Sequence, residues 1–241
     1  MNRFLFVAAL LTASLALADV GKITRLDGAA TRTPKGGAAE ALKDGTAIEL
    51  GDTITVSAGN LKFELTDGSV IALDKGSVLV INEAEFQGQE RSAFSGFLKA
   101  GSLWTKVKKA VGGGKFEVTT ERAVAGVRGT IFRIDADTLV KAAKGGAGGG
   151  VKASIVRVVE GVVAVHPDKI IAKTIKKALP PKGARSEIAG PTQISADEWE
   201  ARFVDLQKNT QIAVGVDLWE QAQYDEAAKH DAFAKWLEKN P

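Results

Sequence analysis

The side chains of this chain that could support chemistry are carboxylates placed beside glycines. Asp52, Asp67 and Asp74 could together ligate calcium or act as the paired carboxylates of a glycosidase. Each of them, however, lies in a glycine-containing turn, where an aspartate accepts backbone N–H hydrogen bonds and needs no further role. Their spacing also differs from that of an EF-hand loop. We therefore interpret all three as turn residues.

Other catalytic or metal-binding groups are sparse in the sequence. The 241-residue chain has two histidines, His166 and His230, one after a predicted strand and one in a predicted helix, and no cysteine. The absence of cysteine excludes disulfides and thiolate chemistry. The small number and the separation of the histidines argue against a catalytic triad or a histidine-rich metal site. The glycine clusters at 112–114 and 144–150 lack the Gly-Lys-Ser/Thr ending of a phosphate loop. We therefore expect no enzymatic activity, no cofactor and no metal.

Arg128 is the most informative single cation. It stands between the apolar residues Val127 and Ile131, in a stretch that we expect to be a core strand. A guanidinium carries five donors and can tie carbonyls or a carboxylate together. Our hypothesis is that Arg128 braces Asp67 or Asp52; the alternative is that it contacts an anionic ligand.

The first 18 residues have the pattern of a secretory signal peptide. Arg3 supplies a positive charge, residues 4–16 are apolar, and residues 16–18 (Ala-Leu-Ala) match the small-x-small site of a signal peptidase. We predict cleavage after Ala18 and a periplasmic or secreted mature chain, the alternative being a retained membrane anchor. No later window approaches the ~20 apolar residues of a spanning helix.

The charge distribution does not favour a nucleic-acid partner. The formal net charge is +3, with lysines concentrated at 106–109 and 169–182. The chain has one tyrosine, and no aromatic residues are interleaved with these lysines, as they are in many nucleic-acid-binding surfaces. We interpret the lysines as solvated loop residues.

The middle of the chain has the pattern of a mainly β fold. Residues 61–65 alternate apolar and polar, which is typical of a half-buried strand. Short strands separated by glycine turns predict a sandwich, a barrel or a solenoid-like stack. Three local features are expected in it: a turn at Asp27-Gly28, a bend between two strands at Gly101, and a hairpin loop at 112–114.

The composition changes after residue 166. Residues 167–194 contain many lysines and four prolines, which predicts a linker or an irregular wrap between a β domain (19–166) and a helical tail (195–241). Ser195 and Glu198 form a capping box for a first helix, and a second helix is expected over about 217–238. Trp199, Phe203 and Trp236 would either cap the β domain or form a partner interface.

Taken in order, the turn motifs resemble those of the FecR domain family over residues 21–165. The residues that carry the resemblance include Gly51, Asp52, Asp67, Gly68, Ser69, Arg128, Gly129, Thr130 and Phe132, followed by Glu160-Gly161-Val162-Val163. The resemblance implies an extracytoplasmic all-β module without catalytic residues. The best-known members relay a signal from an outer-membrane iron–siderophore receptor to a cytoplasmic sigma factor.

These observations predict an exported, non-enzymatic binding or protein-interaction module of the cell envelope. Its partner would be another envelope protein or a cell-wall polymer. The first alternative is a periplasmic co-regulator of a sigma-factor/TonB-receptor system. We expect no cytoplasmic anti-sigma segment and no retained spanning helix, so we do not expect the chain to carry the message across the inner membrane itself. The second alternative is a peptidoglycan- or polysaccharide-binding protein that uses the basic face. The oligomeric state is left open.

Overall fold

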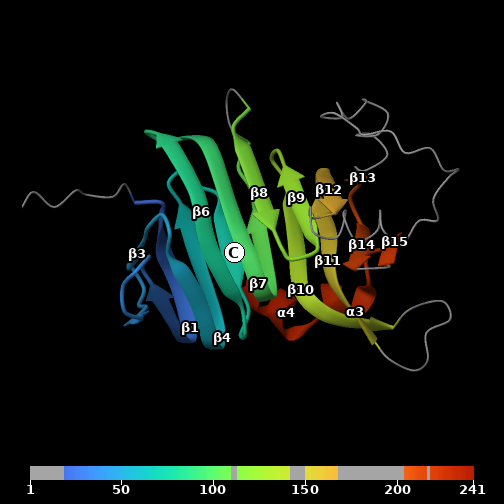
Figure 1. Ribbon diagram of the computed structural model, residues 1–241, viewed down its shortest axis with the longest axis horizontal. Helices are drawn as coiled ribbons and strands as arrows, with labels where there is room; N and C mark the ends of the chain where they lie inside the picture. The colour runs from blue at the N-terminus through green and yellow to red at the C-terminus, as the bar shows by residue number, and fades with distance from the viewer. Residues whose placement is uncertain (1–18, 110–112, 142–149, 168–203, 216–217) are drawn as a thin grey trace, which may run out of the picture.

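A computed structural model describes residues 19–109, 113–141, 150–167, 204–215 and 218–241, and the fold is mainly β as predicted (Figure 1). In these residues 15 strands join one hydrogen-bonded network. The strands are Gly21–Thr33 (β1), Glu40–Ala41 (β2), Ala47–Ile48 (β3), Thr53–Leu65 (β4), Val70–Leu73 (β5), Val78–Gln87 (β6), Glu90–Lys106 (β7), Lys115–Thr119 (β8), Ala123–Val127 (β9), Ile131–Lys141 (β10), Gly150–Glu160 (β11), Val163–Pro167 (β12), Val204–Leu206 (β13), Thr210–Gly215 (β14) and Leu218–Gln223 (β15). Two short helices follow, Glu226–Lys229 (α3) and Ala232–Lys239 (α4).

The network is a sandwich whose two layers share the long strands β4 and β7. In one layer, the first part of β4 pairs with β6, β6 pairs with the first half of β7, and the order continues through β8, β9, β12 and β13. In the other, the second part of β4 pairs with β5, β5 with the second half of β7, and the order continues through β10, β11, β14 and β15. The strands therefore form two packed sheets and not a solenoid-like stack.

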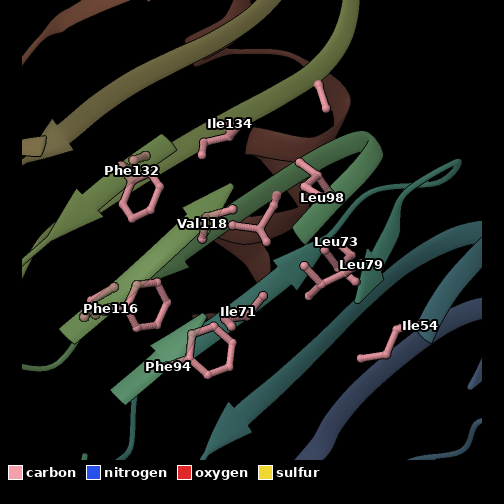
Figure 2. Close-up of a cluster of buried hydrophobic side chains, with 14 of the residues drawn as sticks. Ile54, Ile71, Leu73, Leu79, Phe94, Leu98, Phe116, Val118, Phe132 and Ile134 are labelled. Carbon is pink, nitrogen blue, oxygen red and sulfur yellow. The ribbon is translucent and has the colours of Figure 1, made fainter. Parts of the chain in front are cut away.

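The core lies between the layers and follows the alternation seen in the sequence. Leu61, Phe63 and Leu65 are buried, while Glu64 between the last two is exposed. Phe94 and Phe116 stack with their ring centroids 4.8 Å apart, and Figure 2 shows them in a cluster with core residues of β5 and β10. Burying each such side chain contributes about 1.5–3 kcal/mol, so this cluster is the main source of stability.

The expected turn at Asp27-Gly28 is wrong, because β1 runs straight through both residues. Gly28 pairs with Gly59 of β4. A Cβ at Gly59 would lie 1.6 Å from the Asp27 carbonyl oxygen, and one at Gly28 would lie 2.1 Å from that of Ala58. The two glycines are therefore needed for a close backbone approach in the middle of a long strand pair, and not for a chain reversal.

Gly101 marks a bend, but inside one strand and not between two. Its φ is +82°, and a Cβ there would lie 2.5 Å from the Cα of Ser77. Before Gly101, β7 pairs with β6 and β8; from Gly101 onward it pairs with β10 and then β5. The glycine thus lets one strand pass from one layer to the other.

The expected hairpin before β8 is also wrong. β8 lies parallel to β7, with Ala93 opposite Lys115 and Phe97 opposite Thr119, and two strands in a hairpin must be antiparallel. A Cβ at Gly114 would lie 1.8 Å from the Arg91 carbonyl oxygen. That glycine therefore permits close packing on the start of β7.

The prediction of a helical tail is wrong over residues 204–223, where the described residues form β13, β14 and β15. Ile212 and Val214 are buried, Gln211 and Ala213 are less so, and β14 pairs with β11, so this segment extends the sandwich. Helix begins only at Glu226; Asp225 and Asp231 accept capping hydrogen bonds from the N–H groups of Ala227 and Ala234. The expected helix at 195–203, with Trp199 and Phe203, and the linker over 168–194 lie outside the described residues.

Candidate functional site

Asp67 is a buried turn residue held by Arg91. It accepts hydrogen bonds from the N–H of Ser69 at 2.9 Å and from Ser69 Oγ at 2.8 Å, as well as a buried ion pair from Arg91 Nη1. Arg91 also donates to the Lys108 carbonyl at 3.2 Å, and burial lowers its pKa although Asp67 opposes the shift. The arginine that braces Asp67 is therefore Arg91, and the hypothesis that Arg128 does so is wrong.

Asp52 is held in the same manner by another arginine. Its side chain accepts from the N–H of Glu49 at 2.9 Å and lies 3.6 Å from Arg32 Nη1. Arg32 also donates to the Ala47 carbonyl at 3.0 Å. Burial raises the pKa of Asp52, and the Glu49 N–H and Arg32 partly offset it. The Gly51-Asp52 motif thus fixes the entry into β4.

The Arg128-Gly129-Thr130 motif is the turn between β9 and β10. Gly129 has φ +68°, Thr130 Oγ1 donates to the Val162 carbonyl at 3.0 Å, and Phe132 is fully buried in the core. The Arg128 side chain is exposed and lies beside Gly113, where a Cβ would meet Nη2 at 3.4 Å. Contact between Arg128 and an anionic ligand stays a prediction.

Asp74 is also a turn residue. It accepts from the N–H of Lys75 at 2.7 Å, and burial raises its pKa. Within the described part of the chain, no three His, Cys, Asp or Glu side chains gather as metal ligands would. The three aspartates belong to three separate turns, each with its own hydrogen-bond partners.

Trp236 joins the last helix to the first strand. Its Nε1 donates to Asp27 Oδ2 at 2.6 Å, and its ring stacks on Phe233 with a centroid distance of 6.4 Å. Phe233 is buried on the sheet, and the guanidinium of Arg133 lies 5.3 Å from its ring centre. Of the two roles expected for Trp236, these contacts favour capping of the β domain.

A buried charge network under α3 and α4 was missed from the sequence. Asp135 accepts from Arg133 Nε at 2.8 Å and from Arg157 Nη1, and Arg133 Nη1 donates to Asp231 at 2.6 Å. Burial and then the charge of Arg133 lower the pKa of Arg157 to about 10. The available signal was the occurrence of charged residues inside two strongly apolar strands, β10 and β11. This network fastens the C-terminal helices to the outer face of the sheet.

The same helices and the outer face enclose a groove of about 510 Å³. Trp104, Ile131 and Val159 line it from β7, β10 and β11, and Ala234 and Leu237 line it from α4. Figure 1 shows α4 beside β7 and β10. Most of the lining is apolar, and the volume is that of a small-molecule site.

The free edge of β15 is a second exposed feature. Among the described residues β15 pairs only with β14, and all of its residues after Leu218 are exposed, including Trp219. Tyr224 N–H donates to the Asn209 carbonyl, on the β14 side. Because N–H directions alternate along a strand, Trp219, Gln221 and Gln223 point their N–H groups away from β14.

The sandwich and its turn motifs agree with a family match over residues 29–164, to the family described as FecR protein. Since this match spans more than half of the chain, the protein belongs to the FecR family, as the sequence motifs predicted. β13–β15, α3 and α4 lie beyond the matched residues.

No curated protein matches the chain. Two crystal structures of a candidate anti-sigma factor from Parabacteroides distasonis are similar, with 20% and 19% identity and TM-scores of 0.47 and 0.46. The alignments cover 77% of this chain in both cases, and 63% and 64% of those chains. The chain therefore spans less than two thirds of the proteins in those structures. Within the described residues no helix is long and apolar enough to span a bilayer.

Proposed function

We propose that this FecR-family protein is an exported, non-enzymatic binding module of the cell envelope that receives an extended segment of a partner protein at β15. The observation that carries the proposal is the exposed edge of this strand. An open edge offers a row of N–H and C=O groups, and an added strand satisfies them.

The composition of β15 supports the addition of a strand. Natural edge strands are protected by charged side chains, above all lysine, by proline or by a bulge. β15 (LWEQAQ) has no lysine and no proline, Glu220 is its one charged residue, and its register with β14 is regular from Leu218 to Gln223. Trp219, 37% exposed, supplies the kind of aromatic side chain that anchors interfaces.

A place in envelope signalling is the more specific form of this proposal. It is supported by membership of the FecR family and by the signal-peptide pattern that ends at Ala18. Mass spectrometry of the mature protein tests export directly, and an N-terminus at Asp19 is the expected result. The partner would then be another component of the same signalling system.

The binding test uses proline to block the edge. Gln221→Pro removes an N–H that points away from β14, so the β14–β15 ladder keeps its hydrogen bonds. Tagged wild-type protein, cross-linked in the envelope of its host, is expected to capture a partner that Gln221→Pro loses. Gln221→Thr, which keeps the N–H and favours strand, is the matched control and should retain it.

Deletion of residues 195–241 would not test β15 alone, because it removes β13, β14 and β15 together.

The melting temperature of Gln221→Pro shows whether the variant folds. If the folded variant still captures the same partner, the use of β15 is contradicted.

A further inference from the structure

We infer that the groove between the outer face of β7, β10 and β11 and the helices α3 and α4 binds a long-chain fatty acid. The inference goes beyond the proposed function, because this site shares no residue with the edge of β15. It rests on the apolar lining of the groove, on the pairing of most of its strand backbone within the sheet, and on the charges at its rim.

The groove is lined for an apolar occupant. Ile131 and Val159 come from neighbouring strands, Trp104 lies on β7, and Leu237 forms part of the opposite wall. All four are only partly buried, so apolar surface faces the open volume. A methylene chain that covers this surface removes it from water without any need for polar partners.

Most of the strand backbone on the floor of the groove is already paired within the sheet. β10 pairs with β7 on one side and with β11 on the other. Asn209, which lines one end, donates its N–H to the Val158 carbonyl and accepts from Tyr224 at its own carbonyl. An extended peptide would therefore find few backbone partners for its own N–H and C=O groups, and an acyl chain has no such groups to satisfy.

The rim charges select an anionic head group. Lys106, Lys229 and Arg133 line the groove, and Glu238 is the one carboxylate side chain that lines it among the described residues. Arg133 is already paired with Asp135 and Asp231. Lys229 already bonds Glu226 at 2.6 Å, but Lys106 is exposed and forms no ion pair within the described ranges. Lys106 lies opposite Ile131 in the β7–β10 ladder, which places its ammonium group beside the apolar floor for a carboxylate to reach.

The test measures binding of palmitate to the purified, delipidated mature protein by displacement of a fluorescent fatty acid. Saturable binding at concentrations where palmitate is monomeric is the expected result. Ala234→Leu fills the groove from α4 and should weaken binding by about tenfold or more. Ala232→Leu is the matched control, because Ala232 is exposed on the same helix and does not line the groove.

A second pair of variants tests the head group. Lys106→Gln should weaken palmitate binding by about five- to tenfold and reduce its dependence on salt, while hexadecanol binding is unchanged. Lys99→Gln, on the exposed side of the same strand, should behave as wild type. No saturable binding, or an Ala234→Leu variant of unchanged melting temperature that binds palmitate as tightly as wild type, would overturn the inference.

Palmitate binding and strand addition can fail separately. Gln221→Pro should leave palmitate binding unchanged, because Gln221 does not line the groove. Loss of the protein partner with retained palmitate binding therefore reports on β15 alone, and loss of palmitate binding in Ala234→Leu reports on the groove alone.

Discussion

Arg133 and Arg157 lie directly opposite each other on β10 and β11, with Asp135 bonded to both. Like charges at a cross-strand position repel, and here both guanidinium groups are more than nine-tenths buried. Asp135 bonds both arginines from one side and supplies half of the compensating charge, and Asp231 at the start of α4 contacts Arg133 from the other. The attachment of the C-terminal helices therefore depends on one carboxylate in the middle of β10.

Asp135→Asn is expected to destabilise the protein strongly. The change leaves two buried cations with half of their compensation, and breaking a buried ion pair in this way costs about 3–5 kcal/mol of unfolding free energy. Urea unfolding followed by tryptophan fluorescence measures the change. Asp137→Asn is the control two residues along the strand: its side chain is 33% exposed, and its pairs with Lys152 and Arg122 should contribute less than about 1 kcal/mol. Equal effects of the two substitutions would contradict this account.

Substitution of the two arginines considered as partners of Asp67 should change the stability of the protein by very different amounts. Arg91→Ala leaves Asp67 buried and unpaired, so the free energy of unfolding should fall by about 3–5 kcal/mol. Arg128→Ala changes an exposed side chain at a turn and should stay within about 0.5 kcal/mol of wild type. The melting temperatures of both variants check this. A large loss in Arg128→Ala would restore the original bracing hypothesis.

The sequence could predict the local features and not the distant pairings. Asp52 and Asp67 accept backbone bonds within three residues, so the glycine turns containing them were predictable from neighbours alone. Arg91 is 24 residues from Asp67, and only the layer arrangement brings them together. The turn expected at Gly28 was wrong because a turn and a close approach of two strands both favour glycine, and the partner Gly59 is 31 residues away.

The helix predicted over the first part of 217–238 was wrong for a different reason. Leu218 and Ala222 have helical spacing, yet the exposed edge of β11 pairs with β14, and β14 in turn pairs with β15. Tertiary hydrogen bonding outweighed a weak local preference for helix. The groove could not be predicted from the sequence, because α4 and three strands that are distant in sequence form its walls together.

Gly59→Ala should be among the most damaging small substitutions in this protein. The added Cβ would lie 1.6 Å from the Asp27 carbonyl oxygen, so the β1–β4 pairing must open around it. A loss above about 4 kcal/mol, or failure to fold, is expected. Gly36→Ala is the matched control: its φ is +75°, but no atom lies within 4 Å, so only backbone strain of about 1–2 kcal/mol applies. Expression and urea unfolding compare the two, and a mild Gly59→Ala would argue against the straight course of β1.

The contact between Trp236 and Asp27 should make the attachment of α4 sensitive to acid. The hydrogen bond from Trp236, followed by that from Arg25, lowers the pKa of Asp27 below its ordinary 3.8. A carboxylate whose pKa is lowered in the folded state adds stability above 3.8, and this stability is lost as the pH falls through the lowered pKa. Trp236→Phe keeps an aromatic ring but removes the donor, so its deficit relative to wild type should be largest near neutral pH and shrink below pH 3.8. Urea unfolding of both proteins from pH 7 down to pH 3 measures the difference, and a deficit that is constant over this range would show that the hydrogen bond to Asp27 contributes no net stability.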